Sequence, residues 1–372
     1  MTHHRLAVAV SLLAVALPAQ NTGVLFDASL DGYIEVPYSA QVVPQSGITV
    51  EAWITYDEST LGTGWRWPTI LRHGINSGGE NYMLRVGAAN TNSRNLVWKV
   101  VTQTGASVLA TYPFQPGEFL AWTHVAGTYD GNTLALYING VQVATAPGSG
   151  QPIRDANDVL RIGKGSDVAT PIEVWNGGLD EVRIWPFARS AEDIQQSMNL
   201  ELTSVPGYVS TWNLNNDFLD SSGGQHATSS GQATFTANPL ALSAPIFAFG
   251  IQAGASSPGC LGDIKLCPSG PSVAGYNDFR VVCTRVPPAA LTVWGGSVGT
   301  VTTPLPLLGV DVWLDPTGLV VVSNTADALG SSSANLPIPP GISGFSFGVQ
   351  CIALDPCGQQ GFTASDALVV VI

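Results

Sequence analysis

The sequence predicts an all-β protein: an antiparallel jelly-roll β-sandwich followed by a second, smaller all-β module. Short stretches of alternating apolar and polar residues recur along the chain, and turn residues separate them. The 372 residues include 41 Gly and 25 Pro, and only 11% are charged, which is typical of many strands joined by tight turns. A single short stretch near residue 190 carries helix signals. A chain of this length also favours two domains over one.

The N-terminus predicts export. A short polar start that ends at Arg5 precedes an apolar run, Leu6–Leu17, which is too short to span a bilayer. We expect residues 1–19 to be a signal peptide cleaved after Ala19, with Ala14–Ala16 as an alternative cleavage motif. No later segment has 18 consecutive apolar residues. The expected location is therefore the cell exterior or the periplasm, without a membrane span.

The predicted strands of the first half follow one another at short intervals. They are Gly23–Phe26, Tyr33–Val36, Thr49–Thr55, Thr69–Arg72, Tyr82–Val86, Leu96–Val101, Ser107–Thr111, Trp122–Tyr129, Thr133–Ile138, Val141–Thr145, Val159–Gly163 and Leu179–Trp185. Regular short strands with such turn spacing indicate a sandwich or a barrel and not βαβ units.

The clearest local signal is a three-stranded meander between Trp122 and Thr145. Asn139-Gly140 joins two alternating stretches, and this dipeptide favours a type I′ hairpin because both central residues need positive φ. The only substantial helix is expected at Ala191–Met198, where Ser190 and Asp193 form an acidic variant of the capping box.

These motifs resemble a known family. The motifs are Asp31–Pro37, Ile48–Ile54, Trp122–Gly131, Tyr137–Gly140, Leu160–Gly163, Gly178–Trp185 and Ala188–Ser190. In order and spacing they are similar to the opening, central and closing strands of laminin-G-like (concanavalin-A-like) jelly rolls. The resemblance covers about half the chain and implies a laminin-G-like domain over residues 20–200.

The remaining chain is expected to contain two further parts. Residues 201–243 are interpreted as a trailing segment with a partial repeat and a linker, because Tyr208–Trp212 resembles the opening of a second repeat that is not completed. Residues 244–372 are expected to form a cysteine-containing β module. The distribution of Cys, Gly and Pro along it resembles that in the C-terminal modules of secreted planctomycete-type bacterial proteins.

All five cysteines lie in this last part, and export permits disulfides. The simplest pairing is Cys260–Cys267 with Cys351–Cys357, which leaves Cys283 free, although the sequence allows other pairings. A zinc site is disfavoured because no CxxC motif occurs.

The charge pattern excludes one class of partner and leaves a metal open. A formal net charge of −13 argues against nucleic acid. The same charge is compatible with calcium, and the resemblance implies a structural Ca²⁺ between the first and the closing strand, with Asp27 and Asp180 as candidate ligands.

Catalysis has weak support in the sequence. Two carboxylates on one strand face need i, i+2 or i, i+4 spacing, whereas Asp180 and Glu181 are adjacent and are expected to point to opposite faces. A pair from separate strands stays open. The candidates are Glu51, Glu80, Glu118 and Glu173. We therefore expect no catalytic residues.

Trp65, Arg66 and Trp67 lie in a loop between strands and are the candidate glycan-binding residues, because exposed indole rings stack on sugar faces. Alternatively, one or both rings fold back over the core. The favoured function is recognition or adhesion, with an extracellular glycan or protein as partner. The alternatives are a polysaccharide hydrolase or lyase on the same fold, and a structural spacer of the cell exterior.

Overall fold

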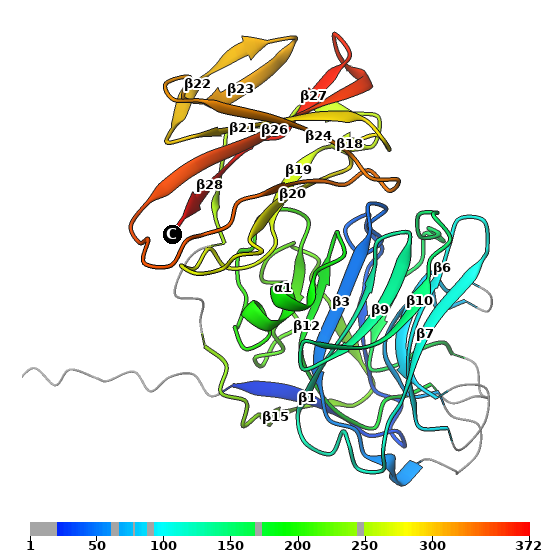
Figure 1. The fold of residues 1–372 in the computed structure, drawn as a ribbon. Coiled ribbons are helices and arrows are strands. Elements are labelled where there is room, and N and C mark those ends of the chain that lie inside the picture. Colours follow the sequence, from blue (N-terminus) through cyan, green and yellow to red (C-terminus); the bar gives the residue numbers. More distant parts are fainter. Residues whose placement is uncertain (1–20, 61–66, 77–78, 88–92, 168–172, 244–248) are drawn as a thin grey trace, which may run out of the picture.

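The computed structural model describes residues 21–372 except 61–66, 77–78, 88–92, 168–172 and 244–248. Within this part the chain forms an antiparallel β-sandwich and an additional all-β module that lies above it in Figure 1. The one α-helix of the described residues, α1 (Ala191–Ser197), begins at Ser190 with the expected capping box to Asp193. No helix in this part is long and apolar enough to cross a membrane.

Two sheets form the sandwich. Among the described residues, one has the order β10 (Val141–Pro147), β9 (Thr133–Ile138), β8 (Thr123–Tyr129), β3 (Ile48–Ile54), β12 (Gly177–Trp185), β1 (Thr22–Phe26) and β15 (Ala233–Ala237), and β13 (Ser210–Trp212) also pairs with β12. The other has the order β14 (Thr228–Ser230), β2 (Tyr33–Val36), β11 (Leu160–Ile162), β4 (Thr69–His73), β5 (Tyr82–Val86), β6 (Asn95–Val101) and β7 (Ser107–Pro113). A 3₁₀ turn, η1 (Glu58–Thr60), follows β3. We call the first of these two sheets the β3 sheet and the second the β4 sheet.

The sandwich core is made by the inward residues of both sheets, including Val50 and Val125 from the β3 sheet and Leu84 from the β4 sheet. Trp98 is fully buried, and its indole lies so close to Gly127 that a Cβ there would come within 2.5 Å of the ring. Glycine is therefore required at position 127. The alternation predicted from the sequence is confirmed, because the predicted strands of this half appear within about two residues of their expected ends.

The segment that follows the predicted boundary at residue 200 contributes strands to the sandwich. Residues 201–243, interpreted as a trailing segment and linker, provide a strand to the edge of each sheet: β15 pairs with β1 and β14 pairs with β2. Trp212 from β13 and Leu214 also lie in the sandwich core. The segment completes the first unit, and long-range pairing of this kind leaves no local signal in the sequence.

The C-terminal module contains two sheets and two hairpins. The larger sheet has the order β16 (Ile251–Ala253), β28 (Ala367–Val371), β26 (Ser346–Gln359), β21 (Leu291–Ser297) and β24 (Val320–Thr325), with β27 (Phe362–Ala364) also paired to β26. The smaller sheet has the order β19 (Lys265–Pro268), β20 (Arg280–Thr284) and β25 (Ser332–Asn335). The hairpins are β17 (Pro258–Gly259) with β18 (Gly262–Asp263), and β22 (Thr300–Leu307) with β23 (Val310–Leu314).

The module packs on the outward side of the β3 sheet, next to α1 (Figure 1). Trp185 and Phe187 share a buried apolar cluster with Phe249, Cys267 and Val282. This contact covers part of the outward side of the β3 sheet.

Candidate functional site

The outward face of the β4 sheet carries a row of polar side chains. Ile34, Leu160 and Leu84 point into the core, so the alternate residues point outward. Register places Arg161 between Glu35 and Arg72, and Met83 between Arg72 and Lys99. We call this outward side of the sheet the β4 face; Arg161, Arg72 and Met83 are buried on it. It gathers basic side chains in a chain with a net charge of −13.

At one end of the β4 face the charges are neutralised. Arg161 donates to Glu35 at 3.0 Å and to Asp167 at 2.7 Å, and its guanidinium lies 4.2 Å from the ring centre of Tyr33. Lys164 pairs with Asp31 and with Asp167. These cations have anionic partners already.

In the middle of the β4 face, Arg72 lies between two carboxylates. Its Nη1 is 3.0 Å from Glu173 Oε2, and its Nη2 is 3.6 Å from Glu80 Oε2. Glu80 also accepts a hydrogen bond from Lys99 at 2.8 Å. Burial alone raises the pKa of Glu80, but hydrogen bonding and charge from Lys99, with Arg72, hold that pKa below its ordinary value. Both glutamates were considered as candidate carboxylates, and the structure brings them together around one arginine.

Arg85 and Trp67 differ from these pairs. The Arg85 guanidinium lies 4.3 Å from the ring centre of Trp67, and both residues are partly exposed. No carboxylate of the described residues lies within ion-pairing distance of Arg85. Arg85 Nε and Trp67 Nε1 are buried atoms without a hydrogen-bond partner among the described residues. An aromatic ring and a guanidinium thus lie side by side, and the guanidinium has no direct ion pair with a carboxylate of the described residues, although the charges of Glu173 and Glu80 act on it.

Trp67 was predicted from the sequence, whereas Trp65 and Arg66 lie outside the described residues. Arg85 was missed. The available signal was its position in β5: Met83 and Arg85 alternate with the core residues Tyr82 and Leu84, which places a basic residue on the outward face.

The two candidate calcium ligands are not brought together. Val24 pairs with Leu179 and Phe26 with Gly177, so Asp180 lies opposite Gly23 and about 13 Å along the strand from Asp27. Asp27 is exposed and accepts hydrogen bonds from Ser29. Asp180 is fully buried and accepts N–H groups from Asn21, Asn238 and Glu181, which occupy the oxygens that a cation needs. These residues do not fit a shared calcium site; calcium binding elsewhere stays a prediction that melting with and without chelator tests.

The expectation that Asp180 and Glu181 point to opposite faces is wrong. The register of β12 against β3 shifts between Asp180 and Arg183, and Glu181 has a φ of 49°. This β-bulge places Leu179 and Val182 in the core and both acidic residues outward. Burial raises the pKa of Asp180 to about 7 and that of Glu181 to about 8. Both carboxyls are fully enclosed, so no substrate reaches them.

Glu51, another candidate carboxylate, belongs to an enclosed ionic network on the outward side of the β3 sheet. It accepts hydrogen bonds from Trp185 at 2.8 Å and from Arg189 at 3.0 and 3.1 Å. Arg189 also donates to Ser269 of the C-terminal module, and Asp193 of α1 pairs with Arg280 of that module. The network joins the two units. The remaining candidate carboxylate, Glu118, lies in a loop. It accepts a hydrogen bond from the Tyr112 hydroxyl at 3.0 Å.

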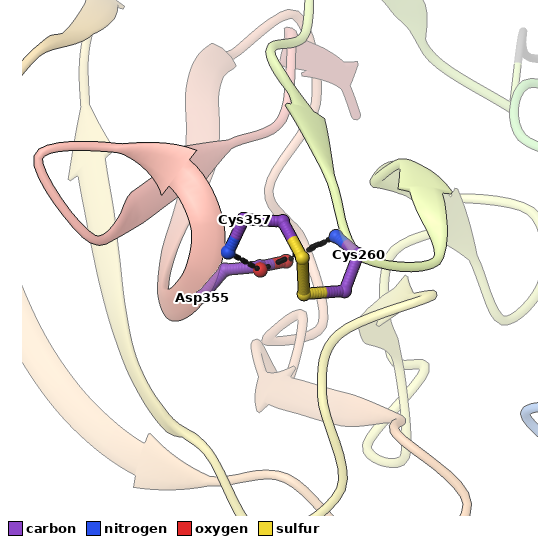
Figure 2. The surroundings of a disulfide bond; sticks show 3 residues. All are labelled: Cys260, Asp355 and Cys357. Carbon is purple, nitrogen blue, oxygen red and sulfur yellow. Dashed lines mark hydrogen bonds between the residues drawn. A yellow bond between two sulfur atoms is a disulfide. The ribbon is translucent and has the colours of Figure 1, made fainter.

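The simplest disulfide pairing is wrong. Cys260 bonds to Cys357 across a sequence separation of 97, and Figure 2 shows Asp355 beside the bond. Asp355 accepts the backbone N–H groups of both cysteines, which holds the two loops together. The sulfurs and this carboxylate lie close enough for a metal, but sulfurs joined in a disulfide are not thiolate ligands, so the group does not fit one. Cys267, Cys283 and Cys351 are buried and unpaired.

Comparison with known proteins identifies the sandwich. Residues 27–195 match the Laminin_G_3 model of the concanavalin A-like lectin/glucanases superfamily. This stretch is therefore a concanavalin A-like domain, as the resemblance implied. Mouse pappalysin-1 is 34% identical over 97 residues, which are 25% of this chain and 6% of that protein.

Several solved structures are similar to the chain at low identity. A Bacteroides ovatus protein described as a candidate carbohydrate-binding protein is 21% identical, with a TM-score of 0.47 over 60% of this chain and 62% of that one. A SAP-like pentraxin from Limulus polyphemus is 14% identical, with a TM-score of 0.41 over 61% and 99% of the two chains. Domain 4 of a GH43 arabinanase from Geobacillus stearothermophilus, solved with arabinotriose, is 17% identical, with a TM-score of 0.33 over 46% and 74%.

Proposed function

We propose that this chain is an exported recognition protein that binds a glycan on the β4 face, at Trp67 and Arg85. The observation that carries the proposal is the contact between a partly exposed indole and a guanidinium that has no carboxylate partner. Indole rings stack on the apolar faces of sugars, and a guanidinium donates to hydroxyl, carboxylate or sulfate oxygens.

The test is retention of the protein on insoluble polysaccharides and on a glycan array. Trp67→Ala and Arg85→Met are expected to weaken binding by about tenfold to a hundredfold, which corresponds to about 1.5–3 kcal/mol for a hydrogen bond to a charged group. Arg285→Met is the matched control, because Arg285 also stacks on an aromatic ring, Tyr208 at 3.8 Å, but belongs to the C-terminal module. Trp313→Ala is the control for losing a partly exposed tryptophan.

Unchanged binding in both β4-face variants contradicts the proposal. Loss of binding in Arg285→Met as large as in Arg85→Met also contradicts it, since the effect then does not depend on the β4 face.

A polysaccharide hydrolase is the second candidate function, and one observation favours it: Glu80 and Glu173 both contact Arg72. A glycosidase needs one carboxylic acid that is protonated at working pH. Lys99 and Arg72 oppose this at Glu80, because they keep its carboxylate ionised. We therefore propose binding without catalysis. Release of reducing sugar by the native protein, abolished in Glu173→Gln, is the result that replaces recognition with hydrolysis.

A further inference from the structure

Two buried thiols face each other across the C-terminal module. Cys283 lies on β20 of the smaller sheet, and Cys351 lies on β26 of the larger sheet. Both are fully buried in the same apolar core, together with Trp294 and Val349. The inward sides of the two sheets thus supply one cysteine each.

Their neighbours fix the two positions against one another. In the smaller sheet Cys283 is paired with Ser332 of β25, and in the larger sheet Cys351 is paired with Trp294 of β21. Trp294 Nε1 donates to Ser332 Oγ at 3.1 Å, which ties the two sheets together beside the cysteines. Burial, followed by the neighbouring Cys351 side chain, raises the pKa of the Cys283 thiol, so the two side chains are neighbours in this core.

The third unpaired cysteine has different surroundings. Cys267 belongs to the apolar cluster between the module and the sandwich, with Trp185 and Phe187, and its thiol donates to the Pro268 carbonyl at 3.6 Å. It therefore lies on the opposite side of the smaller sheet from Cys283.

We propose that Cys283 and Cys351 form a second, inter-sheet disulfide in the exported protein and that Cys267 stays a free thiol. The Cys260–Cys357 bond already requires an oxidising compartment. In the reaction each thiol loses a proton, one S–S bond forms, and two electrons pass to the disulfide of an exchange catalyst, which becomes a dithiol.

The timing of this bond follows from burial. The thiolate is the form that attacks a disulfide, and enclosure in the core raises the pKa of the Cys283 thiol far above its ordinary value. Exchange therefore takes place before the two sheets close over the cysteines, while the chain folds.

Thiol counting on the exported full chain tests the proposal. Free thiols are alkylated at harvest in denaturant, and the modified residues are counted by intact mass. Five cysteines with one disulfide leave three free thiols, whereas two disulfides leave one. We expect one alkylated thiol. Three alkylated thiols per chain overturn the proposal.

Tryptic mapping without reduction identifies the partners. Cleavage after Arg280 and Arg285 releases Val281–Arg285, which carries Cys283, and the fragment Val286–Ile372, which carries Cys351 and Cys357. We expect these two peptides to be linked, and Leu266–Arg280, which carries Cys267, to be alkylated. A linkage between Cys267 and Cys283 overturns the proposal even when the count is one. The control variant Cys267→Ala is expected to keep the link and to show no free thiol.

Discussion

His124 shows how burial decides the behaviour of a titratable residue. It is fully buried in β8, its ring packs edge-on against Trp53 at 5.5 Å, and neither ring nitrogen has a hydrogen-bond partner. Burial lowers the pKa of His124 to about 4, although Glu51 lies 3.8 Å away. A neutral, enclosed imidazole in a strand is a structural histidine and not a base for catalysis.

The free energy of unfolding is therefore expected to decrease as pH falls from 6.5 to about 4, because of the lowered pKa of His124. The unfolded chain takes up this proton near pH 6.5, whereas the folded chain resists it until about pH 4. The contribution is fully present above pH 6.5 and is lost between pH 6.5 and 4, by up to about 3 kcal/mol. Asp180 acts in the opposite direction, because its raised pKa favours the folded state at low pH and that contribution is lost as pH rises towards 7.

A variant separates the two effects. His124→Phe keeps the ring and removes the proton site, so urea unfolding at several pH values should show the variant gaining stability relative to the native protein as pH falls below 6.5. A constant difference between the two proteins from pH 7 to pH 4 contradicts the assignment.

Arg189 is the second residue with a large expected effect. Its fully buried guanidinium contacts Glu51, the Asp193 carbonyl and Ser269 of the C-terminal module. Arg189→Met leaves the Glu51 charge enclosed with weaker compensation, so unfolding should be easier by about 3–5 kcal/mol. In the double variant with Glu51→Gln the loss should be smaller than the sum of the single losses. Additive losses in denaturant unfolding contradict direct coupling.

At the scale of elements, alternation and turn residues predicted the strands of the sandwich because these signals are local. The Asn139-Gly140 turn has the expected positive φ values of 48° and 73°. The bulge at Asp180 and Glu181 escaped prediction, since it arises from the register between β12 and β3. The orientation of side chains beyond such a bulge depends on partners that a single sequence does not specify.

Gly140 supports a prediction about this turn. A Cβ at Gly140 would lie 2.4 Å from Gln195 Cγ of α1, in addition to the strain of a φ of 73°. Gly150 has a similar φ of 70°, with open space around it. Gly150→Ala should cost about 1–2 kcal/mol through backbone strain alone, and Gly140→Ala should cost more. Equal losses in thermal unfolding would show that the turn does not press on α1.

At the scale of the whole molecule, the candidate site was predictable in part. Trp67 was found because a tryptophan in a glycine-rich loop is a local signal. Its partner Arg85 lies on a strand 18 residues away, and the two meet only when the β4 sheet is assembled. The pairing of Cys260 with Cys357 could not be predicted for the same reason. These residues are 97 positions apart in the sequence and meet only when the module folds.

The limits of the first unit give the last prediction. A chain from residue 20 to 200 lacks β13, β14 and β15 and two core side chains, Trp212 and Leu214. Loss of a buried tryptophan and a leucine alone costs several kcal/mol, which is comparable to the whole stability of a domain. A chain that ends at residue 243 keeps these groups but exposes Phe187 and Val205, which the C-terminal module covers. We expect near-UV circular dichroism to show cooperative melting for the longer chain, at a lower temperature than for the full protein, and none for the shorter one. Cooperative melting of the shorter chain would show that residues 201–243 decorate the sandwich without completing it.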